Sequence, residues 1–448
     1  MKFEPINSLR AYTRSSPKMV LTLIIIGILA ILLTVFVWFT PWSENGVRTH
    51  SNTAISLGTR EFYTAVESVT HGVITPIPEA ENIEVLNNGD EFVPDLMKEI
   101  KGAKHSITLA NYIWKEGTLT DGLLDALITK AEEGIEVRVL MDAKGSLKAP
   151  KDKIEKLEKA GGKVASFRPL GIRTITRLNK RTHLRAIVVD GQIGYTGGVA
   201  FDDEWLGDGT KPEEWRDVMF KMHGYGARAV QNMFADLFRQ TTGEVLSGSN
   251  FYPPLPSIVV SDDCLGSCFI PLLHAPSPDV EKNLSDLLWL SIMGAKDHIL
   301  LETPYLLPNS DIMEALKQKA SEGVRVDILV PGPYVDSRIV QMASRSYYTE
   351  ILEAGIHLHE YQPAHMHSKV FSADGHWSII GSANLDNRSS TLNIEGVFGI
   401  ESKTLAQDIE KEFALDRSRS VEVTKDNLTL GILDKLFGHL SRLFAKQY

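Results

Sequence analysis

The chain repeats its own pattern at a nearly constant interval, and this repetition constrains the fold more than any other feature. Three pairs of segments recur in the same order: residues 102–104 and 294–296, which lie 192 positions apart; 133–137 and 322–326, 189 apart; and 183–190 and 367–374, 184 apart. Such regular spacing indicates an internal duplication. At 448 residues the chain also exceeds what one hydrophobic core usually supports. We therefore predict two copies of one domain, over residues 84–250 and 251–425.

Apolar and polar segments alternate within the first copy in a way that is typical of an α/β fold. Helices are expected at 92–100, 120–133 and 154–160, and strands at 83–86, 105–112, 135–141 and 163–167. Alternation of this kind predicts crossover connections and a parallel or mixed sheet that is covered by helices.

A hairpin in the second copy carries the chemically informative residues. Residues 370–371 and 377–380 are expected as its strands, with Asp374-Gly375 at the turn. Alternate side chains of a strand share one face, so His367 and Lys369 should project together. An imidazole beside an ammonium group suits a phosphodiester substrate, because one can attack phosphorus and the other can neutralise its oxygens.

The spacing in this hairpin resembles the signature of the phospholipase D superfamily, also called the His-Lys-Asp family. The positions that match are His367, Lys369, Asp374, Gly381, Ser382 and Asn384. In the first copy, His183, Asp190 and Gly197 match, but Arg185 stands at the lysine position and Ala200 at the asparagine position. Arginine keeps the charge without being interchangeable with lysine. Four further stretches resemble the bacterial cardiolipin synthase branch: residues 201–207, 215–217, 336–338 and 381–389.

The resemblance implies two phospholipase D-like α/β/α sandwich domains that pack face to face and share one site. In that site one histidine would be the nucleophile and the other the general acid, with His183 favoured as nucleophile and His367 as acid. Arg185 and Lys369 would hold the phosphoryl oxygens. The remaining assignments are carboxylates that orient the imidazoles, Asp217 and Glu395; phosphate contacts, Ser382, Asn384 and Gly198; and structural residues at the hairpin turns, Asp190 and Asp374. No metal or other cofactor is expected, because two cations of the chain already neutralise the phosphate.

The resemblance also implies a phosphatidyltransferase that joins two molecules of phosphatidylglycerol into cardiolipin and releases glycerol. Two alternatives stay open. One is a phosphodiesterase that hydrolyses phospholipid or nucleic acid with water. The other is an inactive member that binds phospholipid, which Arg185 and Ala200 suggest. A net charge of -10 argues against nucleic acid as the routine partner. The expected partners are anionic, phosphatidylglycerol-like membrane lipids, and the oligomeric state is left open.

An uncharged segment near the N-terminus predicts a membrane anchor. Residues 19–39 carry no charge over 21 positions, which as a helix spans roughly 30 Å, about one hydrocarbon core. Four basic residues lie in the preceding tail, residues 1–18, whereas Arg48 is the one basic residue in the twenty that follow. The positive-inside rule then places the N-terminus in the cytoplasm. The catalytic part would be extracytoplasmic, on a single-pass protein of the cell (inner) membrane.

Three other segments complete the sequence-based interpretation. Residues 40–83 are polar and weakly patterned, which predicts a linker. Residues 426–448 have apolar residues at helical spacing and predict an amphipathic helix, which either rests on anionic lipid or docks on its own domain. Cys264 and Cys268 form either a short-loop disulfide or a pair of free thiols.

Overall fold

The computed structural model describes residues 21–30, 55–78, 83–171, 178–257, 264, 266–275 and 282–428. The chain divides into a unit over residues 1–44 and a larger unit over residues 45–446. In the first unit, residues 21–30 are helical. They cover ten positions of the predicted anchor at 19–39, whose remainder lies outside the described residues together with the predicted tail at 1–18. Within the described ranges, no helix is both long and apolar enough to cross a membrane.

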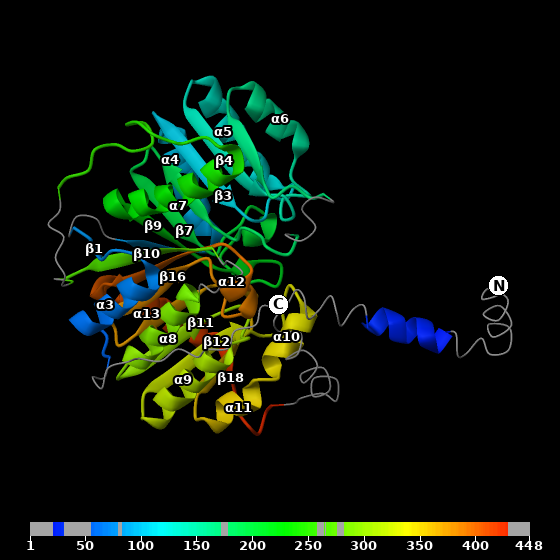
Figure 1. Cartoon of the computed structure of the whole chain (residues 1–448), viewed down its shortest axis with the longest axis vertical. Coiled ribbons are helices and arrows are strands. Elements are labelled where there is room, and N and C mark those ends of the chain that lie inside the picture. The colour runs from blue at the N-terminus through cyan, green and yellow to red at the C-terminus, as the bar shows by residue number, and fades with distance from the viewer. Residues whose placement is uncertain are drawn as a thin grey trace, which may run out of the picture. The chain divides into compact units, whose positions relative to one another are not determined.

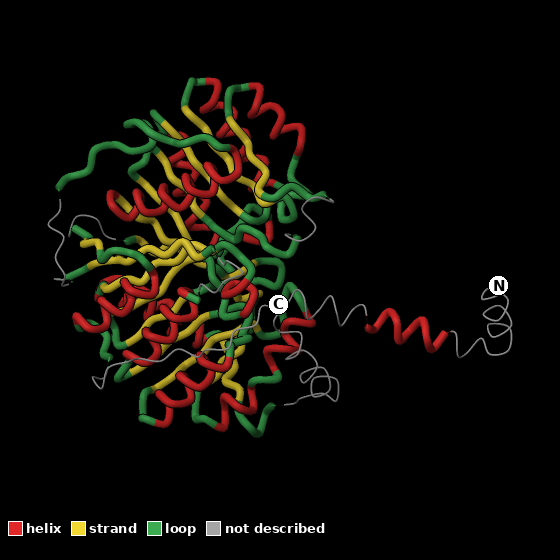
Figure 2. The backbone as a smooth tube through the Cα atoms, in the orientation of Figure 1, coloured by secondary structure: helices red, strands yellow, loops and turns green. Residues whose placement is uncertain are grey.

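The described part of the larger unit contains two large sheets that share one strand order (Figures 1 and 2), and a two-stranded sheet of β14 (His365–Met366) and β8 (Trp215–Arg216). The first sheet runs β2 (Glu84–Asn87), β9 (Val218–His223), β7 (Ile193–Gly197), β6 (Ala186–Val189), β3 (Ser106–Asn111), β4 (Glu136–Asp142), β5 (Lys163–Phe167). The second runs β1 (Thr75–Pro76), β10 (Cys268–His274), β17 (Glu395–Glu401), β16 (Trp377–Gly381), β15 (Val370–Ala373), β11 (His298–Glu302), β12 (Arg325–Pro331), β13 (His357–Tyr361), β18 (Ser420–Val423). In this spatial order, the seven strands from β10 to β13 correspond one for one to the seven strands of the first sheet.

The strand directions are also duplicated. Strands β3, β4 and β5 are parallel to one another, as are β11, β12 and β13, and the other pairs within both sheets are antiparallel. Parallel neighbours need a crossover connection, and helices supply it here. The predicted mixed α/β fold is confirmed.

Helices cover both sheets. In the first half these are α4 (Asn88–Gly102), α5 (Thr118–Glu132), α6 (Lys151–Lys159) and α7 (Gly224–Thr242). In the second half they are α8 (Asn283–Gly294), α9 (Ser310–Ser321), α10 (Arg338–Arg345), α11 (Tyr348–Glu353), α12 (Asn387–Thr391) and α13 (Lys403–Ser418). In Figure 1 the first half occupies the upper part of the view and the second half the lower part.

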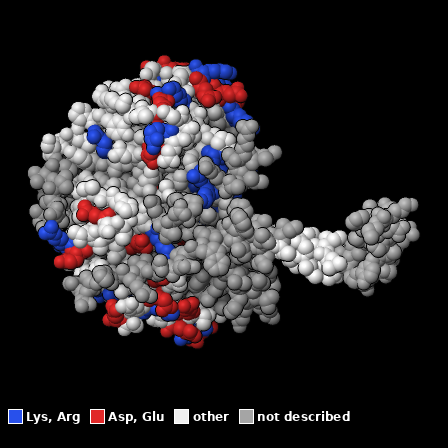
Figure 3. Space-filling view, in the orientation of Figure 1, with Lys and Arg blue, Asp and Glu red and all other residues white. Residues whose placement is uncertain are grey.

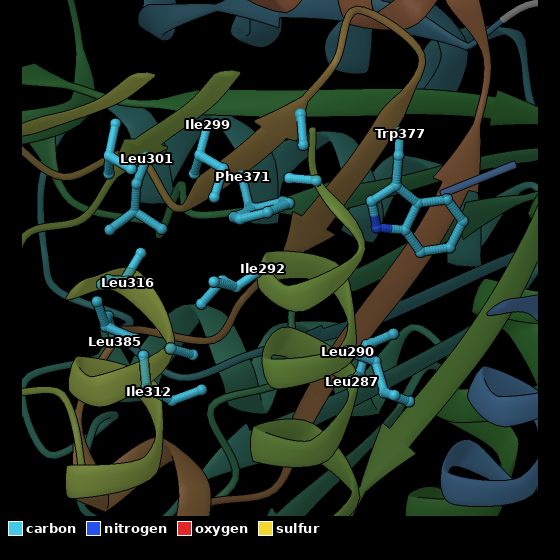
Figure 4. Packing of buried hydrophobic residues seen from close by; sticks show 14 of the residues in the cluster. Leu287, Leu290, Ile292, Ile299, Leu301, Ile312, Leu316, Phe371, Trp377 and Leu385 are labelled. Carbon is cyan, nitrogen blue, oxygen red and sulfur yellow. The ribbon is translucent and has the colours of Figure 1, made fainter. Parts of the chain in front are cut away.

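Three large hydrophobic clusters hold these layers together. One joins α4 and α5 to the first sheet, and another joins α8 and α9 to the second sheet. Figure 4 shows the latter, with Leu301 and Phe371 from the strands opposite Ile312 and Leu287 from the helices. The third cluster combines Phe234 of α7 with residues of both sheets and of α13. This shared core fixes one half against the other, so functional residues of the two halves can meet.

The expectation of a linker over residues 40–83 was wrong for part of that segment. Residues Arg60–Thr70 form helix α3, whose Phe62 and Val66 are fully buried in the core of the second half. Strand β1 of the same segment pairs with β10. The available signal was a helix start, since the side chain of Thr59 accepts the N–H of Phe62. The sequence pattern did not indicate this short amphipathic helix, because the segment contains few apolar residues and is not hydrophobic on average.

Two open questions from the sequence concern the cysteines and the C-terminus. Cys264 and Cys268 are joined by a disulfide, with their Cα atoms 5.8 Å apart. The amphipathic helix expected at 426–448 lies outside the described residues from position 429 onward.

Candidate active site

Two short parallel strand pairs cross from one half of the molecule to the other. Strand β8 (Trp215–Arg216) pairs with β14 (His365–Met366), and Thr182 forms a matching bridge with Ile394. The N–H of His367 donates to the carbonyl of Arg216 at 2.7 Å, and that of His183 donates to Ile394 at 2.8 Å. Each histidine therefore enters the site beside the segment that carries the other half's carboxylate.

His183 of the first half is paired with Glu395 of the second. The Nδ1 atom of His183 lies 3.0 and 3.1 Å from the two carboxylate oxygens of Glu395. The carboxylate is fully buried and accepts the hydroxyl of Ser382 at 2.5 Å and that of Ser389 at 2.8 Å. Because Glu395 occupies Nδ1, the Nε2 atom of His183 is left for the substrate.

His367 of the second half is paired with Asp217 of the first. Its Nδ1 atom lies 2.6 Å from Oδ2 of Asp217, which also accepts the indole N–H of Trp205 at 2.8 Å. The rings of Trp205 and Trp215 pack against the imidazole, with centroids 5.3 and 4.9 Å away. The fixed ring geometry leaves Nε2 of His367 as the second reactive atom.

The two predicted cations are both buried beside the histidines. Arg185 is 1% exposed and donates from Nη1 to the carbonyl of His183 at 2.6 Å, while its Nε has no hydrogen-bond partner in the described part of the chain. Lys369 is 5% exposed, and its Nζ lies 3.0 Å from Nδ1 of His367 and donates to the carbonyl of the same residue. Donor groups held in a water-poor site are suited to binding an anion.

Burial and charge together keep the imidazoles neutral. Burial, assisted by the charge of Arg185, lowers the pKa of His183 to about 4. Burial and Lys369 hold the pKa of His367 well below its usual range. Burial also lowers the pKa of Lys369 to about 7. At neutral pH both histidines thus carry a lone pair that can attack phosphorus or accept a proton.

The two carboxylates differ in their electrostatics. Burial alone would raise the pKa of Glu395, but its contacts with His183 and Ser382 outweigh burial, and the pKa is lowered. Burial raises the pKa of Asp217 despite the nearby Lys369. Glu395 is therefore the more firmly ionised of the two, and the two half-sites are chemically unequal.

The three residues that we expected to contact the phosphate have different surroundings. The hydroxyl of Ser382 faces Glu395. A Cβ at Gly198 would stand 2.1 Å from Oδ1 of Asp217, so this glycine leaves room for the carboxylate. Asn384 is 9% exposed, and its Oδ1 accepts no hydrogen bond from the described residues. Ser382 and Gly198 thus support the carboxylates, whereas Asn384 has a polar atom to offer a ligand.

The motif aspartates bind backbone rather than reacting groups. Asp190 accepts N–H groups of residues 104–106 at the start of β3, and Asp374 accepts those of 296–298 at the start of β11. Both have positive φ, 53° and 54°, which suits a tight hairpin turn. Each carboxylate joins its turn to the neighbouring strand, a longer-range role than the local turn that we predicted.

Several supporting residues were not identified from the sequence. Ser389, Trp205 and Trp215 lie in the stretches that carried the family resemblance, yet nothing in their spacing showed which carboxylate or imidazole they contact. Tyr112 packs edge-on against His183, with ring centroids 5.4 Å apart. Its position just after the buried strand β3 was the available signal, because functional side chains often follow such strands.

The duplicated fold and the paired histidine–carboxylate site define a class of protein that is also found by direct comparison. The chain belongs to the phospholipase D superfamily: the family model "Cardiolipin synthase, PLD-like domain" matches residues 96–209 and 289–417. Among curated relatives, a cardiolipin synthase of Alkalihalophilus pseudofirmus is 37% identical over 71% of this chain and 63% of its own. A probable cardiolipin synthase of Bacillus subtilis is 33% identical over 81% of this chain and 72% of its own.

The comparison with solved structures supports the fold. The crystal structure of phosphatidylserine synthase from Haemophilus influenzae superposes with a TM-score of 0.67 at 16% identity, over 86% of this chain and 98% of that one. The chain spans about 63% of the length of the A. pseudofirmus relative, so less than two thirds of that protein is represented here.

Proposed function

We propose that the protein is a phosphatidyltransferase that makes cardiolipin and glycerol from two molecules of phosphatidylglycerol. The observation that carries this proposal is the meeting of two neutral imidazoles, each oriented by a carboxylate of the other half, beside two buried cations. That arrangement suits a two-step displacement at a phosphodiester. The family model and the cardiolipin synthase relatives support cardiolipin as the product.

The first step would form a phosphohistidine. His367 takes up a proton when the anionic phosphate binds beside it. Nε2 of His183 then attacks phosphorus, the bond between phosphorus and the headgroup oxygen breaks, and the imidazolium of His367 gives its Nε2 proton to the leaving glycerol and becomes neutral. Arg185 and Lys369 hold the phosphoryl oxygens. In the second step, His367 takes the proton from a hydroxyl of another phosphatidylglycerol, whose oxygen attacks phosphorus and releases His183.

The unequal half-sites support this division of roles. Nδ1 of His183 faces the ionised Glu395, an acceptor, which places its proton on Nδ1 and its lone pair on Nε2. Nδ1 of His367 lies 2.6 Å from Asp217, whose negative charge stabilises the imidazolium form of His367. In that form His367 can give a proton from Nε2, as a general acid must.

The activity can be tested by incubating detergent-solubilised protein with phosphatidylglycerol and analysing the lipids by mass spectrometry. We expect cardiolipin and glycerol, and their loss in His183→Ala and in His367→Ala. A phosphatidyl ester of p-nitrophenol, whose leaving group needs no protonation, should still label His183 in His367→Ala. Label on His367 in His183→Ala instead would reverse the roles.

The same assay decides between the alternatives. Phosphatidic acid as the main product would show that water is the acceptor, and lipid binding without product would indicate an inactive member. In a separate incubation with single-stranded DNA, cleavage of the DNA would indicate a nuclease. On the face shown in Figure 3, basic and acidic side chains are interspersed, which does not favour a polyanion.

We further propose a topology for the chain. Residues 19–39 would be a single membrane anchor with the N-terminus in the cytoplasm, and the two domains, residues 84–250 and 251–425, would be extracytoplasmic. The disulfide between Cys264 and Cys268 supports this placement, because disulfides persist in oxidising compartments. Labelling of an engineered cysteine at either side of residues 19–39 in intact cells tests it: a residue after 39 should react with an impermeant reagent.

A further inference from the structure

A pocket lies beside the site in the second half of the chain and is lined by both polar and apolar side chains. The space between its lining residues is about 650 Å³, part of which is open solvent. Its charged and amide residues are Lys369, Glu302, Asp386, Asn384 and Asn309. The apolar residues around it are Leu284, Leu288, Leu301, Ile312, Phe371 and Leu385. In Figure 4, Leu301 and Phe371 lie on the sheet side of this region and Ile312 on the helix side.

The duplication explains why the pocket exists in this half. Leu284 of α8 occupies the position of Phe92 in α4, 192 residues earlier, and Leu385 occupies that of Phe201, 184 residues earlier. The second equivalence is visible in a repeated hydrogen bond, from Lys115 N–H to Phe201 at 3.0 Å and from Leu307 N–H to Leu385 at 2.9 Å.

Aromatic rings take up this region in the first half. Phe92 and Phe201 are fully buried, and their rings contact Tyr195 and Trp114 at 5.9 and 4.5 Å between centroids. Leucine is smaller than phenylalanine, so the exchange at two positions opens the space in the second half.

A polar residue of the pocket lining also distinguishes the second half. Asn384 stands where the first half has the buried Ala200, and the Oδ1 of Asn384 lacks a hydrogen-bond partner throughout the part of the chain described. A buried amide oxygen without a donor is unfavourable unless a ligand supplies one. Lys369 also lines the pocket and would attract a phosphate. The pocket thus combines a cation and a hydroxyl-binding amide with apolar side chains.

We propose that this pocket binds one acyl chain of the donor phospholipid, with its phosphate at Lys369 and a headgroup hydroxyl at Asn384. This inference rests on the proposed function for the identity of the lipid. A glycerophospholipid matches the pocket because it carries an anionic phosphate next to a long apolar chain. In the first half, where the buried rings of Phe92 and Phe201 occupy the equivalent positions, no acyl chain would be held at that place.

The binding test uses phosphatidylglycerol with a photoreactive diazirine near the end of one acyl chain. The host is full-length His183→Ala protein in detergent, so that turnover does not consume the probe. Crosslinks are expected in residues 284–288, 309–316 and 371. Unlabelled dioleoyl phosphatidylglycerol should suppress them more strongly than the dihexanoyl lipid at equal concentration. Equal suppression, or crosslinks elsewhere only, would overturn the proposal.

The matching variant restores the aromatic residues of the first half. In the Leu284→Phe/Leu385→Phe double variant, we expect the pocket crosslinks to be lost and the ratio of kcat/KM for dioleoyl over dihexanoyl phosphatidylglycerol to fall at least tenfold. Leu290→Phe is the control, since Leu290 is buried on the same helix but does not line the pocket. An equal loss for both lipids in the double variant, or the same change in the control, would refute the pocket.

The two readouts separate this inference from the function on which it rests. Cardiolipin formation by the wild-type protein with crosslinks outside the pocket would overturn the pocket and leave the function in place. Crosslinks in the pocket without any lipid product would overturn the function and leave the pocket in place. Should the double variant fail to fold, the competition experiment on the unaltered pocket still decides whether an acyl chain binds there.

Discussion

Replacing Glu395 by glutamine should disable the proposed nucleophile while keeping its shape. The carboxylate is fully buried and accepts from Nδ1 of His183 at 3.0 Å and from the hydroxyls of Ser382 and Ser389. Glutamine removes the negative charge, and its NH₂ group can donate to Nδ1. The proton of His183 then shifts to Nε2, the atom that must attack phosphorus.

The expected loss can be given a magnitude. An isosteric change of the orienting carboxylate costs a Ser-His-Asp site about 10⁴-fold in kcat, which corresponds to about 5.4 kcal/mol. The free energy of unfolding should change by less than this. Ser382 donates to one carboxylate oxygen and Ser389 to the other, so the NH₂ group that replaces one oxygen leaves one of the two hydroxyl protons without its acceptor, at about 1–3 kcal/mol for a buried group.

The assay is the rate of cardiolipin formation beside thermal unfolding. Glu401→Gln provides the control, because Glu401 lies on the same strand β17 and accepts from Nδ1 of His376 at 2.7 Å, outside the site. It should change the rate by no more than roughly threefold. A loss below about tenfold in a folded Glu395→Gln protein would show that Glu395 does not orient the nucleophile.

Three further predictions concern the cation, a glycine and the ion pair behind the site. Lys369 has a pKa of about 7 and is charged below that pH. We therefore expect kcat/KM to fall as the pH rises through about 7, and kcat to fall at higher pH because the bound phosphate stabilises the ammonium. A kcat/KM that stays flat from about pH 6 to about pH 9 would contradict this. Gly198→Ala should displace the side chain of Asp217 and lower kcat by about 10²-fold. Unchanged activity in this variant would contradict the prediction. Arg216→Met should destabilise the fold by about 3–5 kcal/mol in denaturant titration, because it leaves the fully buried Asp416 unpaired. A second change, Asp416→Leu, should recover most of that loss.

Much of the fold follows from local patterns. Strand and helix periodicity places the alternating elements, and the constant interval between copies predicts two sheets with one strand order. The hairpin residues His367 and Lys369 also come together as expected, because they are two positions apart in a locally extended segment. Helix α3 escaped notice because its apolar face is only a few residues wide and derives its stability from the core of the second half.

The site itself depends on contacts that span the whole chain. The sequence identifies both histidines and both carboxylates, since motif spacing is local, but it does not determine which pairs with which. Glu395 lies 212 residues from its partner His183, and Asp217 lies 150 from His367. These pairings exist because the shared core and the two crossing strand pairs bring the halves together. Only the tertiary structure decides which half each carboxylate serves, because burial and hydrogen bonding act between atoms that the sequence leaves far apart.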